Sequence, residues 1–112
     1  ENNSLKKVLD DINKAQELSN SISDSSLLFK SNLYKIVSDV ALNNITLEKA
    51  LTAIANIYDK SLSSSDQGLY YYHLWKFTES EENKNKSLKI YTDLDKDKPS
   101  YFYKEYISDL TT

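Results

Sequence analysis

His73 is the only histidine of the 112-residue chain, and histidine is the side chain best suited to acid–base or metal chemistry near neutral pH. Its neighbours at helical spacing are Leu69, Tyr70, Lys76 and Phe77, and none of them is a carboxylate that could orient the ring. The chain has no cysteine, which excludes a thiolate zinc site, a disulfide and a cysteine nucleophile. We therefore expect His73 to be a half-exposed helix residue, and we expect no metal site.

Glu79, Glu81 and Glu82 form an acidic cluster that could in principle perform acid–base catalysis or bind a hard cation. Lys84 and Lys86 follow at once, and no glycine shapes a ligand loop. A solvated turn between two helices is the preferred interpretation of this cluster.

Asp93, Asp95 and Asp97 alternate along the chain like the ligands of a calcium loop. The glycine and the distal glutamate of an EF-hand are missing, and Lys96 and Lys98 oppose cation binding. We interpret this segment as solvated surface.

Other catalytic motifs are missing as well. No serine lies in a Gly-x-Ser-x-Gly turn, and one glycine, Gly68, cannot form a glycine-rich phosphate loop. We expect a protein that is not an enzyme and that binds no cofactor.

Aromatic side chains are the most informative feature. The chain has nine tyrosines, three phenylalanines and one tryptophan, mostly in its second half. Tyr70–Tyr72, Trp75 and Phe77 surround most of one predicted helix, so they cannot all face one core. Tyrosine and tryptophan are enriched at interfaces, but helices covered on several sides also use them for packing. Both interpretations stay open, and they are compatible.

Charge excludes some partners. All 14 basic residues are lysines, and 17 acidic residues give a net charge of −3. Nucleic-acid binders normally show a basic stripe with arginine, whereas here lysines and acids alternate. We expect neither a nucleic-acid partner nor an anionic membrane partner. The apolar runs, such as Leu27–Phe29, are only a few residues long, and none approaches the length of a membrane span.

The remaining pattern predicts an all-α fold. Glycine and proline occur once each, too rarely for the many turns of a β-sandwich or barrel. Apolar residues recur at spacings of three and four along most of the chain. About six helices are expected: residues 4–20, Ser25 or Ser26 to Asn43–Asn44, a third capped by Thr46, a fourth from about Ser65 to Thr78, a fifth ending before Pro99, and a sixth capped by Ser100.

Two helix pairs repeat at an offset of 37 residues, as from Ala50 to Ser87. The same offset relates Tyr34 to Tyr71, Val37 to Leu74, Ile54 to Tyr91 and Ile57 to Leu94, and Pro99 closes the second pair. This pattern resembles the tetratricopeptide repeat over about residues 31–99, with Ala50 and Ser87 as the small residues where two helices approach. It departs from that family at Trp75 and Thr78, where smaller or aromatic residues are usual.

The resemblance implies antiparallel helical hairpins stacked as a short solenoid; a compact helical bundle is the alternative. We expect a single helical domain over residues 1–112, with an N-terminal helix in 1–24, hairpins over 25–60 and 65–99, and a C-terminal helix over 100–112. The chain begins at Glu1 and has the composition of an AT-rich bacterial genome. We interpret it as a fragment or processed form of a longer protein. A periplasmic or other extracytoplasmic soluble domain of a membrane-anchored protein is expected, with a cytoplasmic protein as the alternative.

The implied function is a non-catalytic interaction module whose concave face binds a peptide or partner protein. By the resemblance, the first helix of each pair lines this face, with Asn32, Lys35, Ile36 and Asp39, then Leu69, Tyr72, His73 and Lys76, continued by Tyr103 and Tyr106. Trp75 belongs to the packing stripe, so Tyr72 and Lys76 are expected on another side. The alternative is a small helical bundle of the bacteriocin-immunity type, on size and composition alone. The partner and the oligomeric state do not follow from the sequence.

Overall fold

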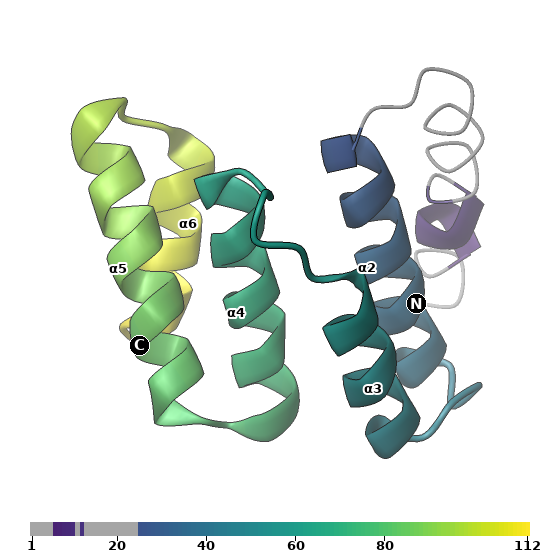
Figure 1. The fold of residues 1–112 in the computed structure, drawn as a ribbon. Coiled ribbons are helices and arrows are strands. Elements are labelled where there is room, and N and C mark those ends of the chain that lie inside the picture. Colours follow the sequence, from purple (N-terminus) through teal and green to yellow (C-terminus); the bar gives the residue numbers. More distant parts are fainter. Residues whose placement is uncertain (1–5, 11, 13–24) are drawn as a thin grey trace. The chain divides into compact units, whose positions relative to one another are not determined.

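A computed structural model describes residues 6–10, 12 and 25–112, and within these ranges all regular secondary structure is helical (Figure 1). The all-α prediction is thereby confirmed. The predicted helix over 4–20 lies mostly outside the described residues. The helices are α2 (Ser25–Ala41), α3 (Leu47–Ile57), α4 (Ser64–Thr78), α5 (Glu81–Asp97) and α6 (Tyr101–Leu110).

Serine or threonine hydroxyls cap the N-termini of four of these helices. The Thr46 side chain accepts a hydrogen bond from the Lys49 N–H at 3.2 Å, and the Ser100 side chain accepts one from the Phe102 N–H at 3.2 Å. Both predicted caps are therefore confirmed. Ser63 caps α4, so this helix begins slightly before the expected Ser65. Ser80 caps α5 in the same way.

The helix ends follow local backbone chemistry. α2 ends at Ala41, earlier than expected, and Asn43 has φ of 60°, a left-handed conformation that asparagine tolerates. α5 ends at Asp97, and Lys98 is extended because the α region is disfavoured before Pro99. The tyrosine run Tyr70–Tyr72 is helical, as predicted, despite its high strand propensity.

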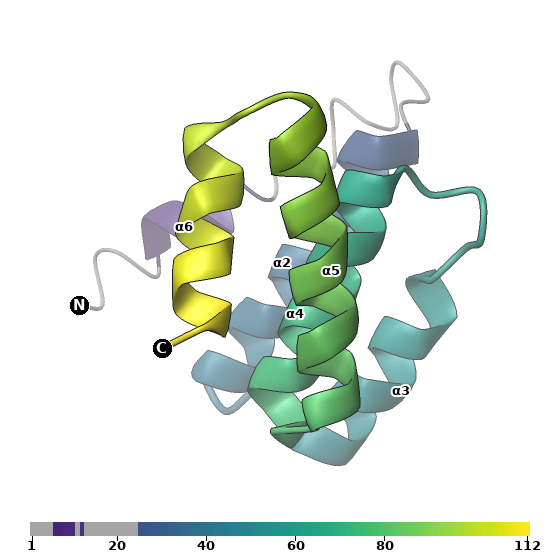
Figure 2. The ribbon, with the colours of Figure 1, turned by 90° about the vertical axis from the view of Figure 1, so that its left-hand side faces the viewer.

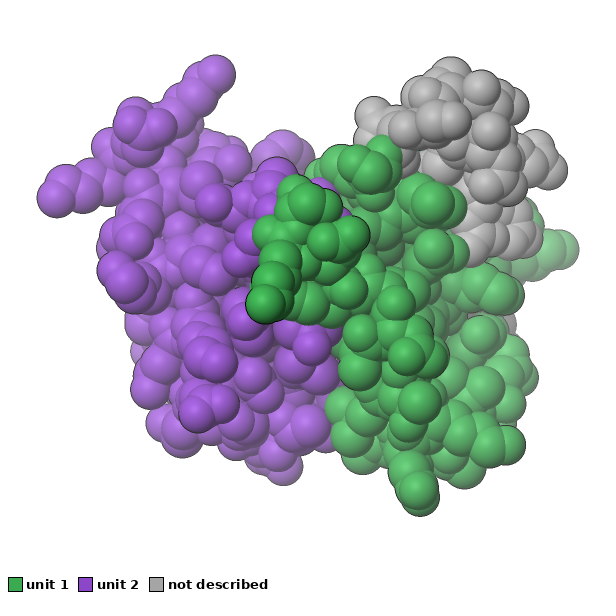
Figure 3. All heavy atoms as spheres, in the orientation of Figure 1, with its two compact units in different colours: residues 1–61 green, residues 62–112 purple. Residues whose placement is uncertain are grey.

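The chain divides into two compact units, residues 1–61 and 62–112 (Figure 3), and each is described by itself. In the first unit α2 packs against α3. Buried side chains there are Phe29, Leu33 and Ile36 on α2 and Ala50 and Ile54 on α3. The packing of these apolar side chains holds α2 and α3 together.

In the second unit α5 packs against both α4 and α6 (Figures 1 and 2). α4 and α5 approach closely at Gly68, where an added Cβ would lie 3.0 Å from the Ile90 side chain and 3.1 Å from the Tyr91 ring. The Ser87 hydroxyl donates a hydrogen bond to the Gly68 carbonyl at 2.9 Å. The absence of a side chain at Gly68 and the small side chain of Ser87 therefore permit this crossing.

Candidate functional site

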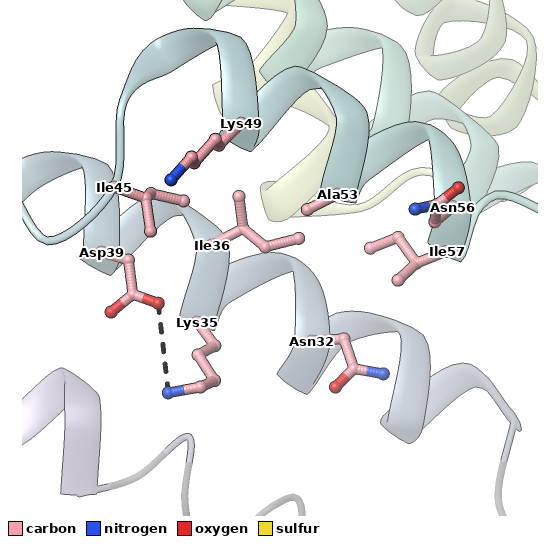
Figure 4. A pocket seen from close by; sticks show the side chains of 9 residues that line it. All are labelled: Asn32, Lys35, Ile36, Asp39, Ile45, Lys49, Ala53, Asn56 and Ile57. Atoms are coloured by element: carbon pink, nitrogen blue, oxygen red, sulfur yellow. Dashed lines mark ion pairs between the residues drawn. The ribbon is translucent and has the colours of Figure 1, made fainter.

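An open groove lies between α2 and α3 of the first unit (Figure 4) and has a volume of about 540 Å³. Four of the residues predicted for the binding face line it, namely Asn32, Lys35, Ile36 and Asp39. The full lining is Asn32, Lys35, Ile36 and Asp39 from α2, Ile45 from the connecting loop, and Lys49, Ala53, Asn56 and Ile57 from α3.

The middle of the groove is apolar. Ile36 lies between the two helices, on the side of Ala53 and Ile57 (Figure 4). Ile36 is 9% exposed, so its side chain supports the hairpin and still reaches the groove surface. Lys49, Ala53 and Ile57 recur every four residues, which places them on one face of α3. An apolar side chain of a ligand could displace water from this region.

One end of the groove is charged, and the other carries amides. Lys49, Ile45 and Asp39 lie at the first end, and Asn32 and Asn56 at the second (Figure 4). The two ends of the groove therefore present different polar groups, charged side chains at one end and amides at the other.

The Asp39 carboxylate is held by its own neighbours. Its Oδ2 lies 4.0 Å from Lys35 Nζ, and its Oδ1 accepts a hydrogen bond from the Asn44 amide at 3.4 Å. In contrast, Lys49 forms no ion pair with any residue in the described part of the chain. Lys49 is therefore the lysine of the groove lining that has no carboxylate paired with it among the described residues.

The other six residues predicted for the binding face lie in the second unit, where two of them, Tyr72 and Lys76, contact Asp109 of α6. The Tyr72 hydroxyl donates a hydrogen bond to Asp109 Oδ2, and Lys76 Nζ lies 2.8 Å from the same oxygen. The rings of Tyr72 and Tyr106 meet edge to face, with centroids 4.9 Å apart. These side chains hold α6 against α4.

Tyr106 and Tyr103 also pack inside the second unit. The Tyr106 ring stacks on buried Tyr91 with centroids 4.6 Å apart, and the Tyr103 ring lies 5.9 Å from Tyr91. Packing is thus one role of these tyrosines. A smaller, mostly polar hollow of about 410 Å³ remains beside Tyr72, Tyr106, Asp109 and the last residue, Thr112.

Tyr72 and Lys76, which were expected on another side of the helix than Trp75, both contact the Trp75 ring. The Tyr72 and Trp75 ring centroids are 5.8 Å apart, and Lys76 Nζ lies 4.9 Å from the Trp75 ring centroid. Lys84 of α5 also lies over this ring, at 5.4 Å. The Trp75 indole therefore packs against Tyr72 and also makes cation–π contacts with Lys76 and Lys84, in which the face of the ring attracts the lysine charge.

His73 is partly buried on α4 beside the Tyr72 ring, with centroids 5.1 Å apart. Burial, and secondarily the positive charge of Lys76, lowers the pKa of His73 to about 4. The imidazole is therefore neutral near pH 7. A neutral, partly buried ring is suited to packing or to a hydrogen bond.

Several acidic residues of the two predicted clusters have lysines beside them. Glu81 and Glu82 lie 3.9 Å and 3.7 Å from Lys84 and Lys86, respectively. Asp95 accepts hydrogen bonds from the Ser100 N–H and from Lys104, and these bonds lower its pKa. Among the residues described, no group of three or more histidine, cysteine, aspartate or glutamate side chains could hold a metal ion.

Some residues that form these contacts were not among the predicted site residues. Asp109 belongs to no recognisable sequence motif. It lies three residues after Tyr106, however, and therefore on the same face of the helix as Tyr106. Lys49 and Ala53 of the groove were also missed. An unpaired lysine and a small side chain are common on any helix, so residue type alone does not distinguish them.

Comparison of the chain with family models, curated proteins and solved structures gave no match. Within residues 6–10, 12 and 25–112, no helix has both the length and the apolar character that crossing a bilayer requires.

Proposed function

We propose that this chain is a non-catalytic protein-interaction module that binds a segment of a partner protein in the α2–α3 groove. The observation that carries the proposal is an open groove of about 540 Å³ with an apolar middle and polar ends. Apolar surface flanked by a few placed polar groups is what binding sites commonly present. Lys35 and Asp39, two of the residues expected to contact a partner, lie on its rim.

The chemistry of the groove favours binding over catalysis. Its lining contains no histidine, cysteine, serine or threonine that could act as a nucleophile or proton shuttle. Its one carboxylate, Asp39, is already engaged by Lys35 and Asn44. The groove therefore offers shape and charge rather than a reacting group.

A tetratricopeptide-like architecture is part of the proposal. Each unit contains a helical hairpin, and Ala50 and Ser87, the two small residues related by the 37-residue offset, are fully buried. Ile54 and Tyr91, related by the same offset, are buried too. These pairs support equivalent helix crossings in the two hairpins. In the second unit α4 and α5 approach closely at Gly68. They do not do so at Trp75, where the family usually has a small residue.

The test uses peptides selected without bias. A displayed library of random peptides is selected against the whole chain, and each selected peptide is titrated into isotope-labelled protein while amide resonances are recorded. We expect the largest shifts at Ile36, Ala53 and Ile57. Resonance shifts confined to α4–α6, or no selected peptide at all, would contradict the proposal.

A matched pair of variants on α3 completes this test. Ala53 lines the groove, whereas Ala55, on the same helix, is exposed outside it. Ala53→Lys should abolish binding of the selected peptides, and Ala55→Lys should leave it unchanged. Thermal unfolding of both variants checks that neither change alters the fold.

A further inference from the structure

We infer that the ligand of the α2–α3 groove is an acidic amphipathic helix, with an apolar side chain on Ile36, Ala53 and Ile57 and a carboxylate at Lys49. This inference rests on the proposed function and names the class of partner.

The groove excludes two of the common ways in which proteins bind peptides. Strand addition needs an exposed sheet edge, and residues 6–10, 12 and 25–112 contain no strand. Recognition of a polyproline helix needs an aromatic-lined groove, and none of the nine lining residues is aromatic. An aliphatic groove between two helices instead fits the apolar face of a third helix.

The sizes of the side chains that line the groove determine where a ligand side chain can insert. Ala53 has the smallest side chain in the lining, and it lies between Lys49 and Ile57 on one face of α3. Ile36 faces it from α2 (Figure 4). A leucine-sized ligand side chain fits above Ala53, because the larger isoleucines on either side form the walls.

Charge selects an acidic ligand. The lining contains two lysines, Lys35 and Lys49, and one aspartate, Asp39, so it is net positive although the whole chain has a net charge of −3. Asp39 already has Lys35 at 4.0 Å and the Asn44 amide at 3.4 Å beside it, whereas Lys49 forms no ion pair in the described part of the chain. A ligand carboxylate therefore meets an unpaired cation at Lys49, whereas a ligand lysine meets only an aspartate that already has a lysine beside it.

The length of the groove sets the spacing of these groups. Lys49 and Asn56 are seven residues apart on α3, which is about 10 Å along the helix axis. A ligand helix thus contacts the groove over about two turns. Its carboxylate lies about one turn from the apolar side chain above Ala53, because Lys49 precedes Ala53 by one turn.

The experiment compares three synthetic helices of about four turns. The first has leucines along one face flanked by glutamates, the second carries lysines in place of the glutamates, and the third carries alanines in place of the leucines. Fluorescence anisotropy with the full chain measures each affinity. We expect the acidic leucine helix to bind more tightly than both others, and to weaken as salt is added.

Charge reversal identifies the contact. Lys49→Glu should weaken the acidic helix about threefold to tenfold, since each open ion pair contributes modestly and reversal adds repulsion. Lys60→Glu, at an exposed lysine outside the groove lining, is the matched control and should have little effect. Equal binding of the acidic and basic helices, or an unchanged affinity of Lys49→Glu, overturns the inference.

A different occupant of the groove would give a different experimental result. If the groove covers a second copy of the chain, the free protein sediments as a dimer that Ala53→Lys dissociates and Ala55→Lys does not, and the inference is wrong. If library-selected peptides shift the groove resonances but the acidic leucine helix does not bind, the groove function stands and the acidic-helix inference fails.

Discussion

Lys76 on α4 and Asp109 on α6 form an ion pair, with 2.8 Å between Lys76 Nζ and Asp109 Oδ2. Tyr72, one turn before Lys76, donates its hydroxyl hydrogen to the same carboxylate oxygen. Asp109 thus joins two side chains of α4 to the last helix of the chain. Residues that the sequence assigns to one binding face therefore also stabilise the second unit.

Acid should weaken this junction. The hydrogen bonds from Lys76 and then Tyr72 hold the pKa of Asp109 below its ordinary value. The unfolded chain therefore takes up a proton at higher pH than the folded chain. The stabilisation is complete above about pH 5 and is lost as the pH falls through the lowered pKa. Asp109→Asn should flatten the loss of unfolding free energy below about pH 4, measured by urea unfolding.

The expected size of the effect is small, because the Lys76 and Asp109 side chains are 43% and 40% exposed. An exposed pair contributes about 1 kcal/mol or less. Asp93→Asn, which removes a similar surface pair with Lys89 within α5, is the control. If both variants show the same acid profile, Asp109 does not have the role described above.

Tyr72, which the sequence predicts for the binding face, is also expected to contribute to stability. Tyr72→Ala removes its contacts with the Tyr106 and Trp75 rings and its hydrogen bond to Asp109. We expect a loss of about 1–3 kcal/mol in urea unfolding. Tyr101→Ala, at a residue that is 72% exposed, should change stability by less than about 0.5 kcal/mol. Equal stabilities of the two variants would place Tyr72 outside the packed cluster.

His73 gives a separate pH dependence at milder acidity. Its pKa is lowered to about 4, so the folded chain binds a proton less readily than the unfolded chain. The corresponding stability is present above about pH 6.5 and is lost as the pH falls toward 4. Unfolding free energy should therefore drop between about pH 6.5 and pH 5 in the native sequence, and much less in His73→Gln.

A direct titration separates the two causes of this shift. We expect the imidazole resonance of His73 to titrate far below its ordinary midpoint, because burial is the larger cause. Lys76→Gln removes the smaller, coulombic cause and should raise the midpoint slightly. A midpoint near 6.5 in the native sequence would show that the ring is well solvated.

The sequence predicted the helices well, because their signals are local. Thr46 and Ser100 cap helices through hydroxyls that contact N–H groups two or three residues away. Pro99 acts on the conformation of the residue directly before it. Each of these effects is contained within one short stretch of chain, so spacing is enough to find it.

The site was predicted less well, because its contacts join residues far apart in the sequence. The hydrogen bond from Tyr72 to Asp109 spans 37 residues. The groove depends on how α2 and α3 cross, which decides that Ala53 faces Ile36. Helical spacing tells which residues share a face, but it does not tell which face of another helix they meet.

Ala50 tests the packing of α2 on α3. It is fully buried, whereas Ala55 on the same helix is exposed. Ala50→Leu should overpack the first unit and lower the unfolding free energy by about 1–3 kcal/mol. Ala55→Leu adds the same atoms at an exposed position and should lower it by less than about 0.5 kcal/mol. Equal tolerance of leucine at both positions would show that Ala50 is not a required small residue.

Gly68 should tolerate substitution least of the residues on α4. A Cβ there would lie 3.0 Å from Ile90 Cγ2 and 3.1 Å from the ring of Tyr91, which is 1% exposed and stacked on Tyr106. The ring cannot move away without disturbing that stack. Gly68→Val should therefore cost at least about 1–3 kcal/mol, more than the gain expected from removing a helical glycine.

Ser64→Val, at an exposed position of the same helix, serves as the control for Gly68→Val. Near-ultraviolet circular dichroism should report a disturbed tyrosine cluster in Gly68→Val and an undisturbed one in Ser64→Val. If Gly68→Val keeps both the native stability and the native aromatic signal, then α4 and α5 do not require close approach at this residue. The hydrogen bond from Ser87 to the Gly68 carbonyl would then not mark a fixed crossing of the two helices.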